Sequence, residues 1–351
     1  MVPRDIESAP PSPAARLTTT TSDADRVASP PEVLASRVED HPALTLTSAD
    51  RRLQATFLPG LGMVCCSLLH DGHQLLDLRG GPAAYEQRGS SFGIPLLHPW
   101  ANRLGGWTYT AGPRHVEMDP ASPAAHPDSA TGLPMHGLLT ASRYWTVTQT
   151  HADSGAAQLL AELDFAAHPA LLAGFPFPHR LALDASVQAN RLAIRLTLTP
   201  TGPDRVPVSF GFHPYLRLRD SARRTWSIEL PVARRAILDA RGIPTGDHQA
   251  LAPGELSGRL GDRSFDDSFD QLDHPDGRPA SFVVADDRRR LTVELVDGYT
   301  VAHVFAPAAS DFVCFEPMTA PVDALRSGCG LRWVEPGSHF AAEFAITVLD
   351  C

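Results

Sequence analysis

Short segments in which apolar and polar residues alternate recur along the chain from His41 onward. The two clearest are residues 180–187 and 191–199, separated by Gln-Ala-Asn, which is typical of a short hairpin turn. Alternation over about four to eight residues is typical of strands with one buried face. The same pattern predicts further strands at residues 43–48, 52–58, 63–69, 226–230, 281–285, 291–296, 301–305, 313–315 and 340–348.

Segments with a helical period and proper caps are scarce, and the 32 prolines favour turns and strand ends over helix interiors. We find no repeat of fixed period, so a propeller is not indicated. The pattern predicts an all-β chain that forms a large antiparallel β-sandwich, with residues 40–351 as a single domain. Residues 1–39 are rich in Pro, Ser, Thr and Ala. We predict a disordered leader there, because such a segment buries too little apolar area to offset its ordering entropy.

The formal net charge of the 351-residue chain is −10. An acidic surface repels phosphate backbones and anionic lipids, so we expect neither nucleic acid nor a membrane as partner. The N-terminus lacks the apolar segment of a signal peptide, and no run of about 18 apolar residues is present. These observations favour a cytoplasmic location.

The chain contains no lysine, which excludes a Schiff-base lysine and a Walker A phosphate loop. Its five cysteines include no CxxC pair, and adjacent Cys65 and Cys66 are predicted to point to opposite faces of a strand. We expect them to be small buried apolar residues rather than disulfides or zinc ligands.

Two glycine-containing segments present polar residues that fit a sugar. Residues 89–106 place Asn102 and Arg103 between Trp100 and a double glycine. A guanidinium can donate two parallel hydrogen bonds to oxygens, an amide offers a donor and an acceptor, and an indole stacks on a sugar face. The alternative interpretation of this segment is a solvated surface turn. Residues 132–138 carry His136 beside a glycine, where an imidazole meets a ligand closely, although a structural loop histidine has the same appearance.

Two apolar segments each end on a titratable residue. His213 follows an apolar strand and precedes Pro-Tyr, and its imidazole donates and recovers a proton near neutral pH. Glu316 ends a wholly apolar run, where partial desolvation increases the basicity of a carboxylate. The alternative for His213 is a buried imidazole bonded to a backbone carbonyl. Paired Asp266 and Asp267, flanked by aromatics, form a further candidate for binding sugar hydroxyls, or a solvated turn.

Taken in order along residues 41–348, these segments resemble the aldose 1-epimerase (galactose mutarotase-like) family. The resemblance rests on PWANRLGG, MHG, FGFHPYL, FDDSF and FEPMTAPVDAL. It implies a β-supersandwich fold and an isomerase that interconverts the α and β anomers of a hexose. It also implies roles for individual residues: Asn102 and Arg103 bind sugar oxygens, His136 positions the substrate, Asp266 (or Asp267, in the alternative register) binds a hydroxyl, His213 is the general acid and Glu316 the general base.

Ring opening of a hemiacetal needs one group to take the C1 hydroxyl proton and another to protonate the ring oxygen, which suits a carboxylate and an imidazole. We therefore expect no cofactor and no metal. The expected partner is a small sugar, and the expected assembly is a monomer or a weak homodimer.

Three other functions remain open. A hexose-6-phosphate 1-epimerase of the same superfamily would need an added arginine cluster, with candidates Arg143, Arg217, Arg219 and Arg332. A non-catalytic sugar-binding protein on the same fold should lose the acid or the base, and both are present. The third is a carbohydrate hydrolase or lyase on a related sandwich, but a glycosidase generally uses two carboxylates across one bond, which a His–Glu pair does not match.

Overall fold

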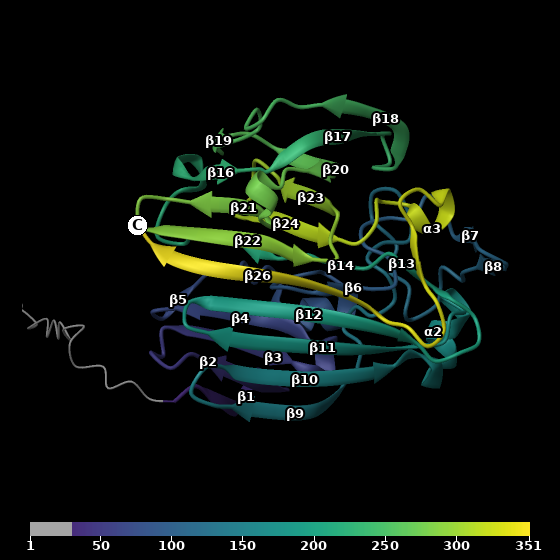
Figure 1. Cartoon of the computed structure of the whole chain (residues 1–351), viewed down its shortest axis with the longest axis horizontal. Helices are drawn as coiled ribbons and strands as arrows, with labels where there is room; N and C mark the ends of the chain where they lie inside the picture. The colour runs from purple at the N-terminus through teal and green to yellow at the C-terminus, as the bar shows by residue number, and fades with distance from the viewer. Residues whose placement is uncertain (1–29) are drawn as a thin grey trace, which may run out of the picture.

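The computed structural model describes residues 30–351, which fold mainly into two layers of antiparallel strands (Figure 1). One layer is a nine-stranded sheet whose longest strands, among them β12 and β26, lie at its centre. In spatial order it contains β19 (Gly258–Arg259), β16 (Ser227–Glu229), β21 (Ala280–Ala285), β22 (Arg289–Asp297), β26 (Phe340–Asp350), β12 (Arg191–Pro200), β11 (His179–Gln188), β10 (Ala157–Asp164) and β9 (Thr146–Ala152).

The other layer consists of two sheets joined by isolated bridges between Cys65 and Ile94 and between Leu76 and Leu216. The five-stranded sheet contains β1 (Glu32–Val38), β2 (His41–Thr47), β3 (Leu53–Leu58), β4 (Val64–His70) and β5 (His73–Gln74). The eight-stranded sheet contains β18 (Pro244–Ala250), β17 (Val232–Leu238), β20 (Phe265–Leu272), β23 (Val301–Ala306), β24 (Val313–Met318), β14 (Gly211–Phe212) and β6 (Leu96–Leu97), and β15 (Tyr215–Leu216) pairs with β24.

Small elements surround the end of the sandwich near β14. They are the hairpin of β7 (Thr108–Ala111) and β8 (Arg114–Glu117), the pair of β13 (Val206–Val208) and β25 (Arg332–Val334), and the helices α2 (Pro169–Gly174) and α3 (Ala324–Ser327). The helix α1 (Gly81–Arg88) packs through Tyr85 on Leu58 of β3 and Val64 of β4. Among the described residues, no helix is long and apolar enough to cross a membrane.

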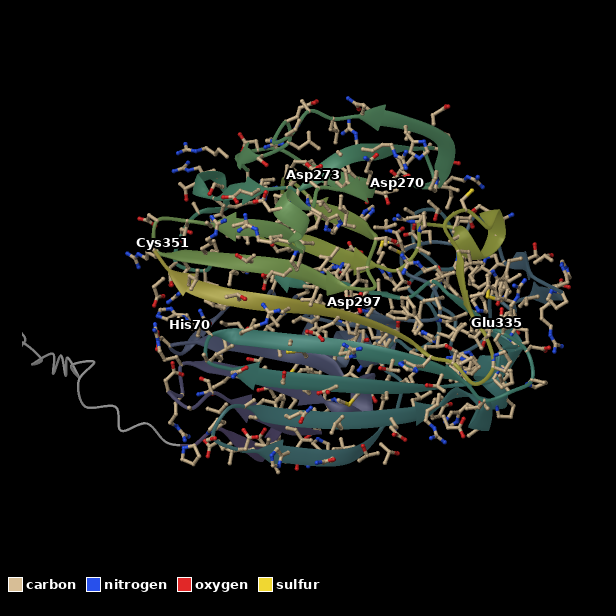
Figure 2. The ribbon with its side chains drawn as sticks, in the orientation of Figure 1. His70, Asp270, Asp273, Asp297, Glu335 and Cys351 are labelled. Atoms are coloured by element: carbon tan, nitrogen blue, oxygen red, sulfur yellow. The ribbon has the colours of Figure 1, made fainter. Side chains whose placement is uncertain are left out.

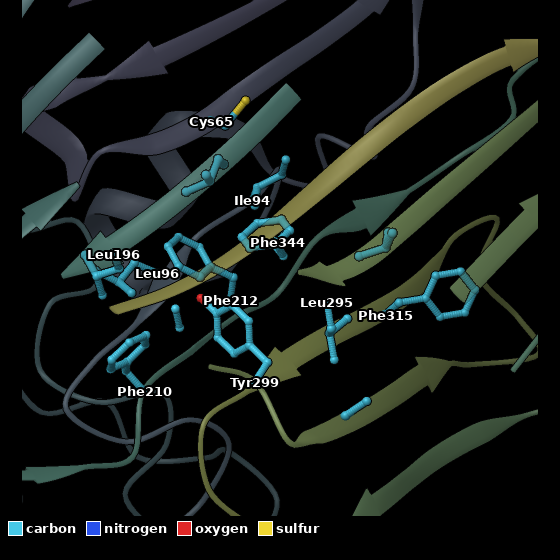
Figure 3. Close-up of a cluster of buried hydrophobic side chains, with 14 of the residues drawn as sticks. Cys65, Ile94, Leu96, Leu196, Phe210, Phe212, Leu295, Tyr299, Phe315 and Phe344 are labelled. Carbon is cyan, nitrogen blue, oxygen red and sulfur yellow. The ribbon is translucent and has the colours of Figure 1, made fainter. Parts of the chain in front are cut away.

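The hydrophobic core lies between the two layers, where the inward-facing positions of the alternating strands meet (Figure 3). Phe344 of β26 packs on Phe212 of β14 with ring centroids 5.1 Å apart, and Phe282 of β21 packs on Phe315 of β24 at 5.6 Å. Each pair joins the nine-stranded sheet to the eight-stranded one. The predicted large antiparallel β-sandwich is confirmed, because two antiparallel layers share one apolar interior.

The prediction of a disordered leader over residues 1–39 is wrong for its C-terminal part. Glu32–Val38, assigned to the disordered leader, form β1, which pairs with β2 over its whole length. Its central side chains are exposed, and only Val33 and Val38 pack against the apolar clusters. Backbone hydrogen bonds to β2 supply most of what holds this edge strand, so the criterion of low apolar content missed it. Residues 1–29 of the predicted leader lie outside the described residues.

The two adjacent cysteines behave as predicted. Cys65 packs in the main core, whereas Cys66 packs in a separate apolar cluster with Leu58, Tyr85 and Phe92. All five cysteines of the chain are unpaired, but the expectation that they are buried is wrong for Cys329 and Cys351, which are exposed.

Candidate active site

A pocket with a volume of about 340 Å³ lies over the eight-stranded sheet and is lined by every residue chosen from the sequence as a first-choice site residue. Three of them come from the sheet: β20 and β24 each supply a carboxylate, and an imidazole directly follows β14. The other three come from loops. The six residues are Asn102, Arg103, His136, His213, Asp266 and Glu316.

The predicted acid and base form a direct pair. His213 Nε2 lies 3.2 Å from Glu316 Oε1, and the two residues are 4% and 1% exposed. The His213 ring stacks on Tyr215 with centroids 4.3 Å apart, and its Nε2 is also 3.3 Å from the Tyr215 hydroxyl. Gly211 allows this approach of β14 to β24, since a Cβ there would lie 2.6 Å from the Pro317 carbonyl oxygen.

Burial shifts the two groups in opposite directions. It raises the pKa of Glu316 to about 8, against the opposing positive charge of His303. Burial, followed by the nearby His136 and His303, lowers the pKa of His213 well below its ordinary value. Near neutral pH the pair is therefore electrically neutral and holds one transferable proton, which suits it for moving protons to and from a bound substrate.

The loop that carries His136 is held against the segment that carries Asn102. The His136 backbone N–H donates to the Asn102 carbonyl oxygen at 2.8 Å, and both residues have positive φ. The His136 ring meets the His213 ring edge to face, with centroids 5.4 Å apart. Burial, then the charge of Arg103, lowers the pKa of His136 to about 3, so this imidazole is neutral and offers one donor and one acceptor.

Arg103 is fixed rather than solvated. Its Nε donates to Asp128 Oδ2 at 3.1 Å, and an Nη donates to Asn102 Oδ1 at 3.3 Å. Thr131 also donates to Asp128, which anchors the carboxylate from a second side. The alternative of a solvated surface turn is wrong for this segment, because the guanidinium is held in the pocket wall by two hydrogen bonds.

The two neighbouring aspartates of β20 point in different directions. Asp266 lines the pocket and accepts a hydrogen bond from His303 Nε2 at 2.8 Å. Asp267 forms an ion pair with Arg235 on β17, with 3.2 Å between Nη1 and Oδ1, and does not line the pocket. Successive strand residues face opposite sides of a sheet, so the pocket position belongs to Asp266.

Comparison with known proteins decides the family. Residues 45–347 match the sequence profile of the family described as aldose 1-epimerase. The chain belongs to the aldose 1-epimerase family. No curated protein sequence matches it significantly.

Solved structures share the fold of this aldose 1-epimerase family member. A galactose mutarotase-like protein from Clostridium acetobutylicum has a TM-score of 0.80 at 16% identity, covering 92% of this chain and 99% of its own. Galactose 1-epimerase from Lactobacillus acidophilus NCFM has a TM-score of 0.71 at 16% identity, covering 91% and 98%. A protein from Synechocystis is 23% identical with a TM-score of 0.68, covering 91% and 97%. These likenesses establish the galactose mutarotase-like β-supersandwich expected from the sequence.

Several pocket residues of this family member were not chosen from the sequence. His303 lies in the predicted strand 301–305, Tyr215 lies in FGFHPYL without an assigned role, and Arg79, Arg88 and His126 lie outside the motifs. A signal existed for His303: it is a titratable residue in an otherwise apolar segment, as Glu316 is. The arginines left no comparable signal, because Arg is common in a chain without lysine.

Outside the pocket, His70, Asp71 and Asp350 bring three possible metal ligands within 4.8 Å of one another. This group lies at the edge of the molecule where His70 and Cys351 are labelled in Figure 2. The Arg52 guanidinium donates to both carboxylates, so these ligands are already engaged by a cation and do not favour a metal.

Proposed function

We propose that this chain is an aldose 1-epimerase that interconverts the α and β anomers of a hexose, with His213 as general acid and Glu316 as general base. The observation that carries the proposal is the buried His213–Glu316 pair, with 3.2 Å between Nε2 and Oε1, in a pocket that also presents sugar-binding groups. Asn102, Arg103, His136 and Asp266 supply fixed donors and acceptors around that pair.

The single proton of the pair is sufficient for both halves of the reaction. The shifted pKa values leave the resting proton on Glu316, and its transfer across the 3.2 Å contact to His213 gives the reactive form of the pair. In this form Glu316 is a carboxylate that takes the proton of the C1 hydroxyl while His213 protonates the ring oxygen, and the C1–O5 bond breaks. The C1–C2 bond then rotates. On reclosure Glu316 returns its proton to O1, and His213 takes the proton from O5. Every proton is returned, so the enzyme ends in its starting state.

The experiment is polarimetry of freshly dissolved α-glucose and α-galactose with and without the protein. We expect the protein to speed the relaxation of at least one sugar, because the pair supplies both proton transfers that water supplies slowly. A rate equal to that of the buffer for all the sugars tested would overturn the proposal.

One observation favours a phosphorylated substrate as the second candidate. None of the candidate arginines Arg143, Arg217, Arg219 and Arg332 lines the pocket, but Arg79 and Arg88 do. Arg79 donates to the Tyr215 hydroxyl at 3.0 Å, and a Cβ on its neighbour Gly80 would lie 3.9 Å from an Nη of Arg88. Guanidiniums that line a pocket and take no part in the His213–Glu316 pair fit a phosphate, so glucose 6-phosphate is the third sugar to compare.

Asp266→Asn is expected to lower kcat/KM about tenfold or more, because the variant loses the negative charge that strengthens hydrogen bonds to sugar hydroxyls. Asp267→Asn, the same change on the neighbouring residue that pairs with Arg235, is expected to stay within about threefold of the wild type, since Asp267 does not line the pocket and its ion pair is only partly buried. The same polarimetric assay measures both variants. Equal losses in the two would contradict the assignment of Asp266 to the substrate.

A further inference from the structure

A third imidazole lies beside the base on the floor of the pocket. His303 on β23 is the direct cross-strand partner of Glu316 on β24, and both side chains line the pocket. Directly opposed residues of an antiparallel pair have Cβ atoms about 4.5–5.5 Å apart and share one face of the sheet. His303 therefore faces Glu316 from a different strand than His213 does.

His303 is tied on its other side to a carboxylate. Its Nε2 lies 2.8 Å from Asp266 Oδ1, on the next strand β20. His303 is 1% exposed, and its Nδ1 is buried without a hydrogen-bond partner among residues 30–351. A buried imidazolium is stable only beside a negative charge, and here the Asp266 carboxylate provides it.

The two histidines next to Glu316 consequently differ in charge. Burial alone would lower the pKa of His303, but the hydrogen bond to Asp266 and the charge of Glu316 outweigh it and raise that pKa. The pKa of His213 is lowered by burial and then by the nearby His136 and His303. The same hydrogen bond and the charge of His303 outweigh burial at Asp266 and lower the pKa of its carboxyl. The Asp266–His303 pair is thus an ion pair, whereas the His213–Glu316 pair holds one mobile proton.

We propose that His303, held by Asp266, is a positioning residue that supplies positive charge to Glu316 and sustains the carboxylate that the general base requires. The proposal rests on the proposed function, because it concerns the base of that reaction. Without this cation, a carboxyl buried on an apolar strand would hold its proton more tightly still. The titratable and charged groups that face Glu316 or His303 are His213, Tyr215, Asp266, Arg103, His136 and Cys314.

The test is an NMR titration of the Glu316 carboxyl in protein labelled with ¹³C at the glutamate carboxyls, with the signal assigned by its loss in Glu316→Gln. In His303→Gln we expect the Glu316 midpoint to rise by about one pH unit or more, since an opposite charge within about 4–6 Å shifts a pKa by that much. The acid limb of the kcat/KM profile against pH should move upward by the same amount. A role in packing alone would move neither midpoint.

His248→Gln is the matched control. His248 on β18 also forms a His–Asp pair, with 2.8 Å between its Nε2 and Asp270 Oδ2, in the same sheet but outside the pocket; Asp270 is labelled in Figure 2. The Glu316 midpoint should not move in this variant.

A second variant keeps the test decisive if His303→Gln does not fold. In Asp266→Asn, which leaves His303 in place, the imidazole midpoint of His303 should fall by about one unit or more, because its anionic partner is gone. An unchanged or lower Glu316 midpoint in His303→Gln, or an unchanged His303 midpoint in Asp266→Asn, overturns the proposal. These titrations need no substrate, so they determine the charge on His303 whether or not the protein turns over a sugar. A failure to turn over any sugar would contradict only the proposed function.

Discussion

Glu316→Gln is expected to lower kcat/KM for mutarotation by at least about a hundredfold, the lower end of what general acid–base catalysis contributes. The amide keeps the size of the side chain but accepts no proton from the C1 hydroxyl. His213→Asn should cause a loss of the same order, because it removes the group that protonates the ring oxygen. Polarimetry at saturating and at low sugar concentration separates the effects on kcat and KM.

Both losses should appear mainly in kcat, since the interaction removed is made in the transition state rather than in substrate binding. Glu343→Gln is the control for the change of charge. Glu343 lies on β26 of the nine-stranded sheet in an exposed ion pair with Arg195 and does not line the pocket, so its variant should retain near wild-type activity. Near wild-type activity in Glu316→Gln or in His213→Asn would contradict the assignment of these residues as general base and general acid.

The strands that alternation predicted pack on the core, although β10, which alternates in the same way, was not among them. Residues 180–187 and 191–199 correspond to β11 and β12, whose side chains alternate between buried and partly exposed. β18 escaped prediction because nearly all of its side chains lie toward solvent, so no apolar alternation marks it. β20 carries the FDDSF motif, which was taken as a possible turn; it is a strand because β17 and β23 pair with it on both sides. Such pairing depends on partners far away in the sequence, which local patterns do not encode.

The candidate site was likewise predictable only in part. Chemical type and local context were enough to single out Glu316 and His213, but not to show that their side chains lie 3.2 Å apart. The choice between Asp266 and Asp267 needed the strand register, because neighbouring residues on a strand face opposite sides. A role for His303 could be inferred only once its cross-strand position opposite Glu316 was known.

Gly137→Ala is expected to lower both activity and stability strongly, because Gly137 sits where the His136 loop meets the His98 backbone. A Cβ at this position would lie 2.1 Å from the His98 carbonyl oxygen and 2.3 Å from its carbon, and φ is +76°. Backbone atoms cannot rotate away as a side chain can, and the Leu138 N–H donates to the same oxygen at 2.7 Å. We expect the free energy of unfolding to fall by about 2–5 kcal/mol, the sum of a positive-φ penalty and overpacking.

The accompanying loss of kcat/KM should be about a hundredfold, because the clash displaces the neighbouring His136 by about 1 Å from its place beside His213. Gly132→Ala is the matched control: Gly132 precedes the same loop with φ of +69°, and a Cβ there would meet no atom within 4 Å. Its cost should be only the positive-φ penalty of about 1–2 kcal/mol, with activity nearly unchanged. Urea unfolding followed by tryptophan fluorescence, with polarimetry on the folded proteins, measures both quantities. Equal effects of the two substitutions would mean that backbone conformation alone, and not the close contact with His98, makes glycine necessary at 137.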